Sequence, residues 1–205
     1  MVNKMVTIND AGREVLLILC KDFSRMYSIT YLAGEVNMSR VGMWKVIKNL
    51  KEEKLITLIP LGKGKTGVSV VRLNWDNIIL KKALELYLIE ESEQQERWKF
   101  NFSELEEITN FSIIYGSILK SAEKTNDIDI INIAKKKDFI KIQNTLDKAQ
   151  KTQAKKIHTI NFTSEEFKQE LIKENKAFID ALKKGVILFG QENFIKFMEQ
   201  IQSKK

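Results

Sequence analysis

Apolar residues in the first quarter of the chain recur at the spacing of short amphipathic helices. One apolar pattern runs from Val15 to Cys20, and two more run through Tyr31–Val36 and Val41–Leu50. A residue that can accept a hydrogen bond from first-turn amides precedes each pattern. These candidate caps are Asn9 or Asp10, Ser28 and Ser39. The pattern therefore predicts three consecutive helices, with Cys20 and Trp44 in the core.

The pattern then changes to two short apolar segments separated by glycines. Residues 55–60 and 68–73 are rich in β-branched side chains, and the segment 62–67 between them contains three glycines and two lysines. This arrangement predicts a β-hairpin, because glycine adopts the positive φ angles that hairpin turns require. A helix from Asp76 or Asn77 to about Glu91 follows. It is apolar around so much of its circumference that we expect a second domain or a twin subunit to cover it.

The second half alternates between strand-like and helix-like segments. Strands are predicted at 111–115, 127–134 and 156–162. A capping box, Thr163 to Glu166, opens one of the later helices, and a last helix is predicted near the C-terminus. Strands alternating with helices indicate a sheet layered with helices, so the chain as a whole is predicted to be α+β.

Composition narrows the class of protein. The 205 residues have 43% hydrophobic and 30% charged side chains, which is typical of a soluble globular protein. No apolar run is long enough to span a membrane and no signal peptide is visible, so we expect a cytoplasmic protein without a membrane partner. One cysteine excludes an internal disulfide, and one histidine excludes chemistry that needs two. The net charge of +7, spread over both halves, is compatible with a nucleic-acid partner.

The order of three helices and a hairpin resembles the winged helix-turn-helix domain over about residues 8–75. In that family the third helix enters the major groove of double-stranded DNA and the hairpin contacts the neighbouring backbone. The resemblance implies DNA-binding residues on or near the third helix, next to Met43 and Trp44, and in the hairpin. They are Ser39, Arg40, Lys45, Lys48, Lys63 and Lys65. The alternative is that these charges lie on the solvated surface of a protein-interaction module.

One stretch of the second half combines residues that suit phosphate and metal chemistry. Gly116-Ser117 directly follows a predicted strand, where a glycine lets backbone amides approach an anion closely. Asp127 and Asp129 are two residues apart on the next strand, so their carboxylates lie on one face. Two neighbouring carboxylates repel each other unless a cation lies between them. Mg²⁺ or Mn²⁺ with nucleotide phosphates is the usual solution.

A strand, Gly-Ser, a spacer and Asp-x-Asp on the following strand resemble the minimal nucleotidyltransferases of the DNA polymerase beta type, over roughly residues 103–190. The resemblance implies that Gly116 and Ser117 hold the triphosphate, with Lys120 approaching the phosphates. It also implies that Asp127 and Asp129 are catalytic and bind Mg²⁺ or Mn²⁺. The alternative is a chance Gly-Ser and a surface pair of aspartates.

The sequence departs from that family at one position. Active members carry a third carboxylate on the next core strand, but residues 156–162 contain none. Glu165 and Glu166 lie just beyond it on a predicted helix start, and His158 or Asn161 could face the site. General-base help is worth about 10²–10⁴-fold, so nucleotidyl transfer should be slow without it. Binding of a nucleotide–metal complex could survive this loss.

The predicted organisation is a winged helix domain at 1–75, a connecting helix at 76–98 and a mixed-sheet nucleotidyltransferase domain at 99–205. One predicted function is metal-dependent NTP binding with transfer to a hydroxyl of a protein or nucleic acid. The alternative is a DNA-binding transcriptional regulator whose nucleotidyltransferase-like domain is catalytically degenerate. A purely structural interaction protein would have no affinity for metal or nucleotide.

Overall fold

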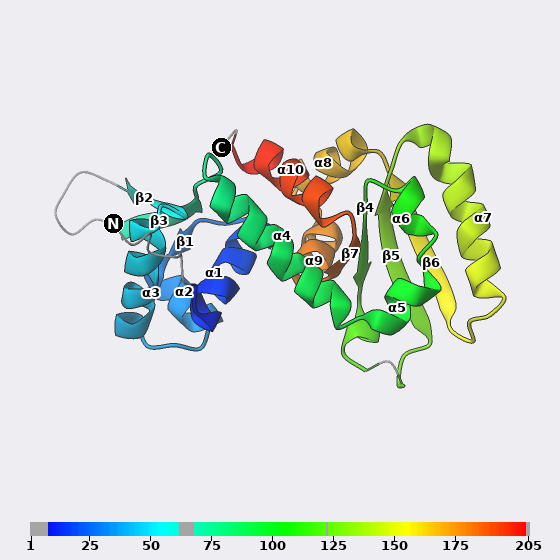
Figure 1. Cartoon of the computed structure of the whole chain (residues 1–205), viewed down its shortest axis with the longest axis horizontal. Coiled ribbons are helices and arrows are strands. Elements are labelled where there is room, and N and C mark those ends of the chain that lie inside the picture. The colour runs from blue at the N-terminus through cyan, green and yellow to red at the C-terminus, as the bar shows by residue number, and fades with distance from the viewer. Residues whose placement is uncertain (1–7, 62–67, 122, 204–205) are drawn as a thin grey trace, which may run out of the picture. The chain divides into compact units, whose positions relative to one another are not determined.

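The computed structural model describes residues 8–61, 68–121 and 123–203 (Figure 1). The chain divides between Leu84 and Glu85 into two compact units, each with its own sheet. The predicted α+β class with a mixed sheet is confirmed. In the part of the chain that the structure describes, no helix has the length and apolarity to cross a membrane.

Three helices form most of the N-terminal unit. They are α1 (Asp10–Lys21), α2 (Ile29–Glu35) and α3 (Arg40–Glu52). The predicted capping is confirmed at each helix, and Asn9 rather than Asp10 caps the first. The Asn9 side chain accepts from the amide of Gly12, Ser28 from that of Tyr31 and Ser39 from that of Gly42. Cys20 is buried, as predicted.

The sheet of this unit is antiparallel, in the order β1-β3-β2. Its strands are β1 (Tyr27–Ser28), β2 (Ile56–Leu61) and β3 (Val68–Leu73). The two predicted strands are therefore confirmed, whereas β1 is too short to leave a periodic pattern in the sequence. Lys63 and Lys65 of the predicted hairpin turn lie outside the described residues.

The predicted core position of Trp44 is wrong. Its side chain on α3 is 53% exposed, and Val41 beside it is 70% exposed. Met43, which the resemblance placed near the reading surface, is instead fully buried. The core face of α3 is made by Met43, Val46, Ile47 and Leu50, and this stripe is already wide enough to hold the helix on its unit.

Helix α4 (Ile78–Glu93) begins after Asn77, whose side chain accepts hydrogen bonds from the amides of Ile79 and Leu80. The helix crosses the division between the two units. Two short helices follow, whereas the sequence predicts one connecting helix over residues 76–98. They are α5 (Glu96–Asn101) and α6 (Leu105–Ile108). A twin subunit on α4 stays a prediction.

The C-terminal unit contains a four-stranded mixed sheet in the order β6-β5-β4-β7. Strand β4 pairs antiparallel with β5 and β7, and β5 pairs parallel with β6. The strands are β4 (Phe111–Tyr115), β5 (Asp127–Ile133), β6 (Lys156–Phe162) and β7 (Val186–Phe189). The later helices are α7 (Phe139–Gln150), α8 (Ser164–Ile172), α9 (Lys176–Lys184) and α10 (Gln191–Gln202).

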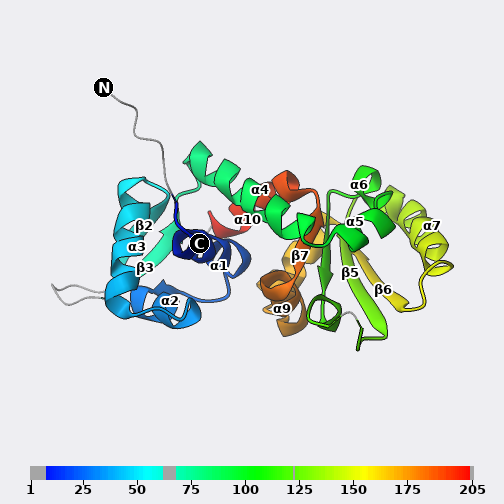
Figure 2. The ribbon, with the colours of Figure 1, turned by 60° about the horizontal axis from the view of Figure 1, so that its bottom comes forward.

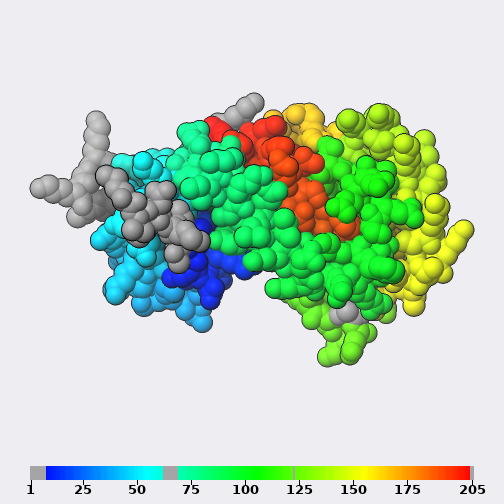
Figure 3. Space-filling view, viewed as in Figure 1, coloured from blue at the N-terminus to red at the C-terminus, as the bar shows by residue number. Residues whose placement is uncertain are grey.

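The two faces of this sheet are covered by different helices. Ile128 and Ile130 point to the face covered by α5, α6 and α7, which form much of the surface of this unit in Figure 3. In Figure 2 these helices lie on one side of the sheet and α9 on the other. Phe111 meets Phe167 of α8 and Phe194 of α10 on the second face. The predicted capping box of Thr163 and Glu166 opens α8.

Candidate functional site

Gly116 forms a sharp bend immediately after β4. Its φ is 87° and its ψ is −161°, a combination that is essentially restricted to glycine because a Cβ would collide with the backbone. A short 3₁₀ helix, Ser117–Leu119, follows the bend. Both Gly116 and Ser117 are exposed. The bend therefore leaves its backbone and the Ser117 hydroxyl open to a ligand from solvent.

The two aspartates lie at the start of β5, beside this bend. Strand pairing places Asp129 opposite Tyr115, the last residue before Gly116. A Cβ built on Gly116 would stand 2.5 Å from Asp129 Oδ2, so the carboxylate lies directly against the glycine. Asp127 is two residues earlier and therefore on the same face. The connection from β4 to β5 lies at the lower end of the sheet in Figure 1.

The electrostatics of Asp129 disfavour its charge. Burial raises the pKa of this carboxyl above its usual range, the neighbouring His158 lowers it, and the charge of Asp127 raises it further. No described group donates a hydrogen bond to Asp129. Burial and the charge of Asp129 raise the pKa of Tyr115 above its usual range. A cation bound between the two aspartates would relieve the unfavourable charge.

Strand β6 brings His158, but not Asn161, to the aspartates. His158 pairs in register with Asp129, and its Nε2 lies 3.3 Å from Asp127 Oδ1. Asn161 is on the opposite face, where its side-chain oxygen accepts a hydrogen bond from Asn132 at 3.0 Å. Of the two polar residues of β6 that could face the site, only the histidine therefore does so.

Two lysines lie at the same end of the sheet. Lys120 follows the 3₁₀ helix and is exposed, with no described carboxylate at ion-pair distance. Lys156, which the sequence analysis did not consider, is paired in register with Asp127. It is two residues before His158 and therefore on the same face of β6. The parallel register of β5 and β6 was the missing information, since it cannot be read from the sequence of either strand.

The residues present suit a cation that arrives with phosphate rather than one held by the protein alone. Within the described residues, no three histidine, cysteine, aspartate or glutamate side chains are grouped to hold a metal ion. Mg²⁺ is usually held by one or two carboxylates, with substrate phosphates and water supplying the other ligands. Asp127 and Asp129 fit this requirement, because they share a face and no group in the described part of the chain donates a hydrogen bond to Asp129.

A second candidate surface is the solvent face of α3. Arg40, Lys45 and Lys48 are all exposed, and Trp44 lies between them. Residues three or four apart on a helix share a face, so the four side chains form one surface. Lys48 is 3.8 Å from Glu52, and an exposed ion pair of this kind contributes little to stability. Ser39 lies at the start of this surface, where its hydroxyl caps the helix.

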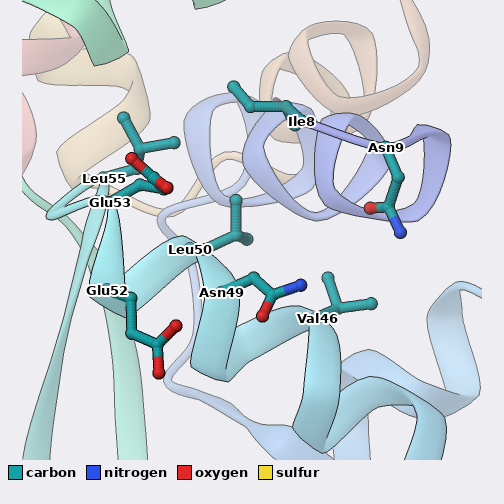
Figure 4. Close-up of a pocket in the computed structure, with 8 residues that line it drawn as sticks. All are labelled: Ile8, Asn9, Val46, Asn49, Leu50, Glu52, Glu53 and Leu55. Carbon is teal, nitrogen blue, oxygen red and sulfur yellow. The ribbon is translucent and has the colours of Figure 1, made fainter. Parts of the chain in front are cut away.

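A pocket of about 320 Å³ lies between the N-terminus of α1 and the C-terminal half of α3 (Figure 4). Two of its polar residues already have partners. The Asn9 side chain caps α1, and Glu52 lies near Lys48. None of the predicted site residues lines this pocket.

No family model, curated protein or solved structure matches the chain. The geometry of the two candidate sites is therefore the basis of the functional proposals.

Proposed function

We propose that the C-terminal unit binds a nucleoside triphosphate together with a divalent cation, and that its chemistry is nucleotidyl transfer. The position of the Asp129 carboxylate against Gly116 is the observation that supports this most directly. A phosphate group at the exposed bend would lie beside both aspartates. One cation could then contact the phosphate and the carboxylates at the same time.

In this proposal Gly116 and Ser117 hold the phosphate chain and Lys120 offsets its charge. Backbone amides of a tight bend and a hydroxyl donate to phosphate oxygens, and an ammonium group adds a point charge. Asp127 and Asp129 hold the Mg²⁺ or Mn²⁺ that accompanies the nucleotide. Binding replaces the repulsion between the two carboxylates with attraction to the cation.

The transfer step joins an acceptor hydroxyl to the α-phosphorus. The hydroxyl oxygen forms the new bond, the bond from the α-phosphorus to the bridging oxygen breaks, and pyrophosphate leaves. The hydroxyl proton passes to water, because β6 offers no carboxylate as a base. We therefore expect slow transfer beside ready nucleotide binding. The acceptor is a hydroxyl of a protein or of a nucleic acid.

Calorimetry with a non-hydrolysable NTP analogue and Mg²⁺ tests the binding. Asp127→Ala with Asp129→Ala should abolish the metal-dependent affinity. The control is Asp147→Ala with Asp180→Ala, which removes two exposed carboxylates elsewhere in the same unit. Equal affinity in both double variants would contradict the site. Labelled NTP tests transfer, with label sought on the chain, on added nucleic acid and on lysate proteins.

A second function, double-stranded DNA binding by the N-terminal unit, is supported by the exposed basic face of α3. Arg40, Lys45 and Lys48 would contact phosphates and release counterions. Lys45→Ala with Lys48→Ala should weaken duplex binding and reduce its salt dependence. Lys137→Ala with Lys151→Ala removes the same charge from the other unit and is the control. A wild-type chain that does not shift a duplex at low salt would exclude this function. If only DNA binding is found, the chain is better described as a regulator with a degenerate transferase-like unit.

A further inference from the structure

Strand β6 has two chemically different faces, and the single histidine of the chain is on the face of the aspartates. Thr159 and Asn161 point to the other face, where Asn132 donates to both side chains at 3.0 Å. Thr159 and Asn161 therefore accept hydrogen bonds from the buried Asn132 side chain, which gives both residues a structural role. His158 has no such buried partner among the residues that the structure describes. Its one described side-chain partner is Asp127, and both side chains are about half exposed.

The separation of His158 and Asp127 suits two ligands of one metal ion. A charge-assisted hydrogen bond is usually about 2.7–2.9 Å long, whereas Nε2 and Oδ1 are 3.3 Å apart. Two ligands at right angles, each about 2.1–2.3 Å from a metal ion, lie roughly 3.0–3.3 Å apart. The two atoms can therefore contact one ion with little movement of either side chain.

We propose that His158 and Asp127 form a mixed nitrogen–oxygen ligand pair, so that the nucleotide enters with a divalent transition-metal ion in preference to Mg²⁺. The proposal rests on nucleotide binding at Gly116 and extends it to the choice of metal. Imidazole is a good ligand for first-row transition metals and a poor one for Mg²⁺, which prefers oxygen. The described residues contain no group of three histidine, cysteine, aspartate or glutamate side chains that could hold a metal ion. Phosphate oxygens of the nucleotide must therefore complete the coordination shell.

Since His158 is the only histidine of the chain, its imidazole gives one set of nitrogen resonances in a tag-free protein. Adding Zn²⁺ with the NTP analogue to the full chain should shift the Nε2 resonance strongly and Nδ1 much less. Mg²⁺ with the same analogue should leave both nearly unchanged. If Zn²⁺ and the analogue saturate the site while both nitrogens keep their positions, the imidazole does not bind the ion and the proposal is wrong.

Calorimetry of the analogue with Mn²⁺ and with Mg²⁺ gives the metal preference as a ratio of two affinities. We expect the wild type to favour Mn²⁺ by at least about tenfold. His158→Ala should bring the ratio near one, and His158→Asp, which supplies a third oxygen ligand, should raise the Mg²⁺ affinity. Lys156→Ala is the control on the same face of β6. It should change both affinities together and leave their ratio unaltered.

The outcomes separate the two proposals. If a folded wild-type chain fails to bind the analogue whichever metal ion is added, nucleotide binding at this site is wrong, and the metal preference falls with it. Binding that is equal with Mg²⁺ and Mn²⁺, or a ratio that His158→Ala does not change, would overturn only the role of His158.

Discussion

Asp22 in the N-terminal unit is buried and Asp129 in the C-terminal unit is half-buried, but only Asp22 is surrounded by hydrogen-bond donors among the described residues. Asp22 is 3% exposed. It accepts hydrogen bonds from the hydroxyl groups of Tyr27 and Ser24 and from the Ser24 amide, and Arg25 lies 3.8 Å away. Burial, then the hydrogen bond to Asp22, raises the pKa of Tyr27, which keeps the phenol a donor.

Asp129 differs in each of these respects. No described group donates to it, and its nearest charged neighbours include a second carboxylate. A buried acid that the fold satisfies contributes to stability, whereas the charge of a half-buried acid with no donor among the described groups costs some free energy until a ligand arrives. The comparison therefore assigns Asp22 to structure and Asp129 to binding, and variants of Asp22, Gly116 and Asp129 test that assignment.

The largest effect should come from Asp22→Ala. The change leaves the buried Tyr27 hydroxyl and the Ser24 amide without their acceptor, which should lower the free energy of unfolding of the N-terminal unit by about 3 kcal/mol. Hydrogen exchange at the amides of α1 and α2 would measure it. Asp180→Ala, which removes only the exposed pair with Lys184, should cost less than about 0.5 kcal/mol. Equal losses in the two variants would contradict the structural role of Asp22.

Gly116→Ala should have the second largest effect. The backbone conformation at φ 87° costs an alanine about 1–3 kcal/mol, and the added Cβ would displace the Asp129 carboxylate. We expect lower thermal stability and loss of metal-dependent nucleotide affinity in calorimetry. Gly34→Ala in α2 is the control, because nothing lies within 4 Å of its Cβ position and alanine favours helix. Unchanged nucleotide affinity in Gly116→Ala would separate the bend from binding.

Asp129→Asn should have a smaller effect of opposite sign. Because the folded chain raises the pKa of Asp129, its ionised form costs stability, and this cost is absent below the unfolded pKa of about 3.9. Wild-type stability should therefore fall relative to the variant as the pH rises through the folded pKa. Solvent screening limits the gain at pH 7 to less than about 1 kcal/mol. Urea unfolding of both proteins between pH 3 and 7 measures the difference, and a less stable variant at pH 7 would show that the carboxylate is satisfied.

Much of the fold follows from local sequence signals. Asn9, Ser28, Ser39 and Thr163 begin helices where their side chains predicted, and Phe111–Tyr115 and Lys156–Phe162 are strands with the predicted bounds. The adjacency of Gly116 and Asp129 follows from the observed antiparallel pairing of β4 and β5, which places the end of one strand beside the start of the next.

Long-range pairing could not be predicted in the same way. The parallel register of β5 and β6 determines that His158 rather than Asn161 faces the aspartates, and it brings Lys156 to the same edge. Neither strand carries a sequence signal for that register, because both contain polar residues on each face. The apolar pattern of residues 41–50 includes Trp44 and so predicts a core position for it. The helical periodicity of α3 is satisfied without it, by Met43, Val46, Ile47 and Leu50.

Trp44 extends the comparison of the two aspartates to a pair of tryptophans, and Trp44→Ala should have the smallest effect on stability. Trp98 in the C-terminal unit is buried and stacked on Phe102, so its size has a structural reason. Trp44 is half exposed among basic residues, and its removal should change the free energy of unfolding by less than about 0.5 kcal/mol.

A ring kept on a basic surface without a role in folding is suited to contact a ligand, here the DNA that the α3 face is proposed to bind. Duplex affinity should therefore fall several-fold in Trp44→Ala while urea unfolding is unchanged. A variant that is clearly destabilised, or that binds duplex as well as the wild type, would remove Trp44 from the proposed DNA surface.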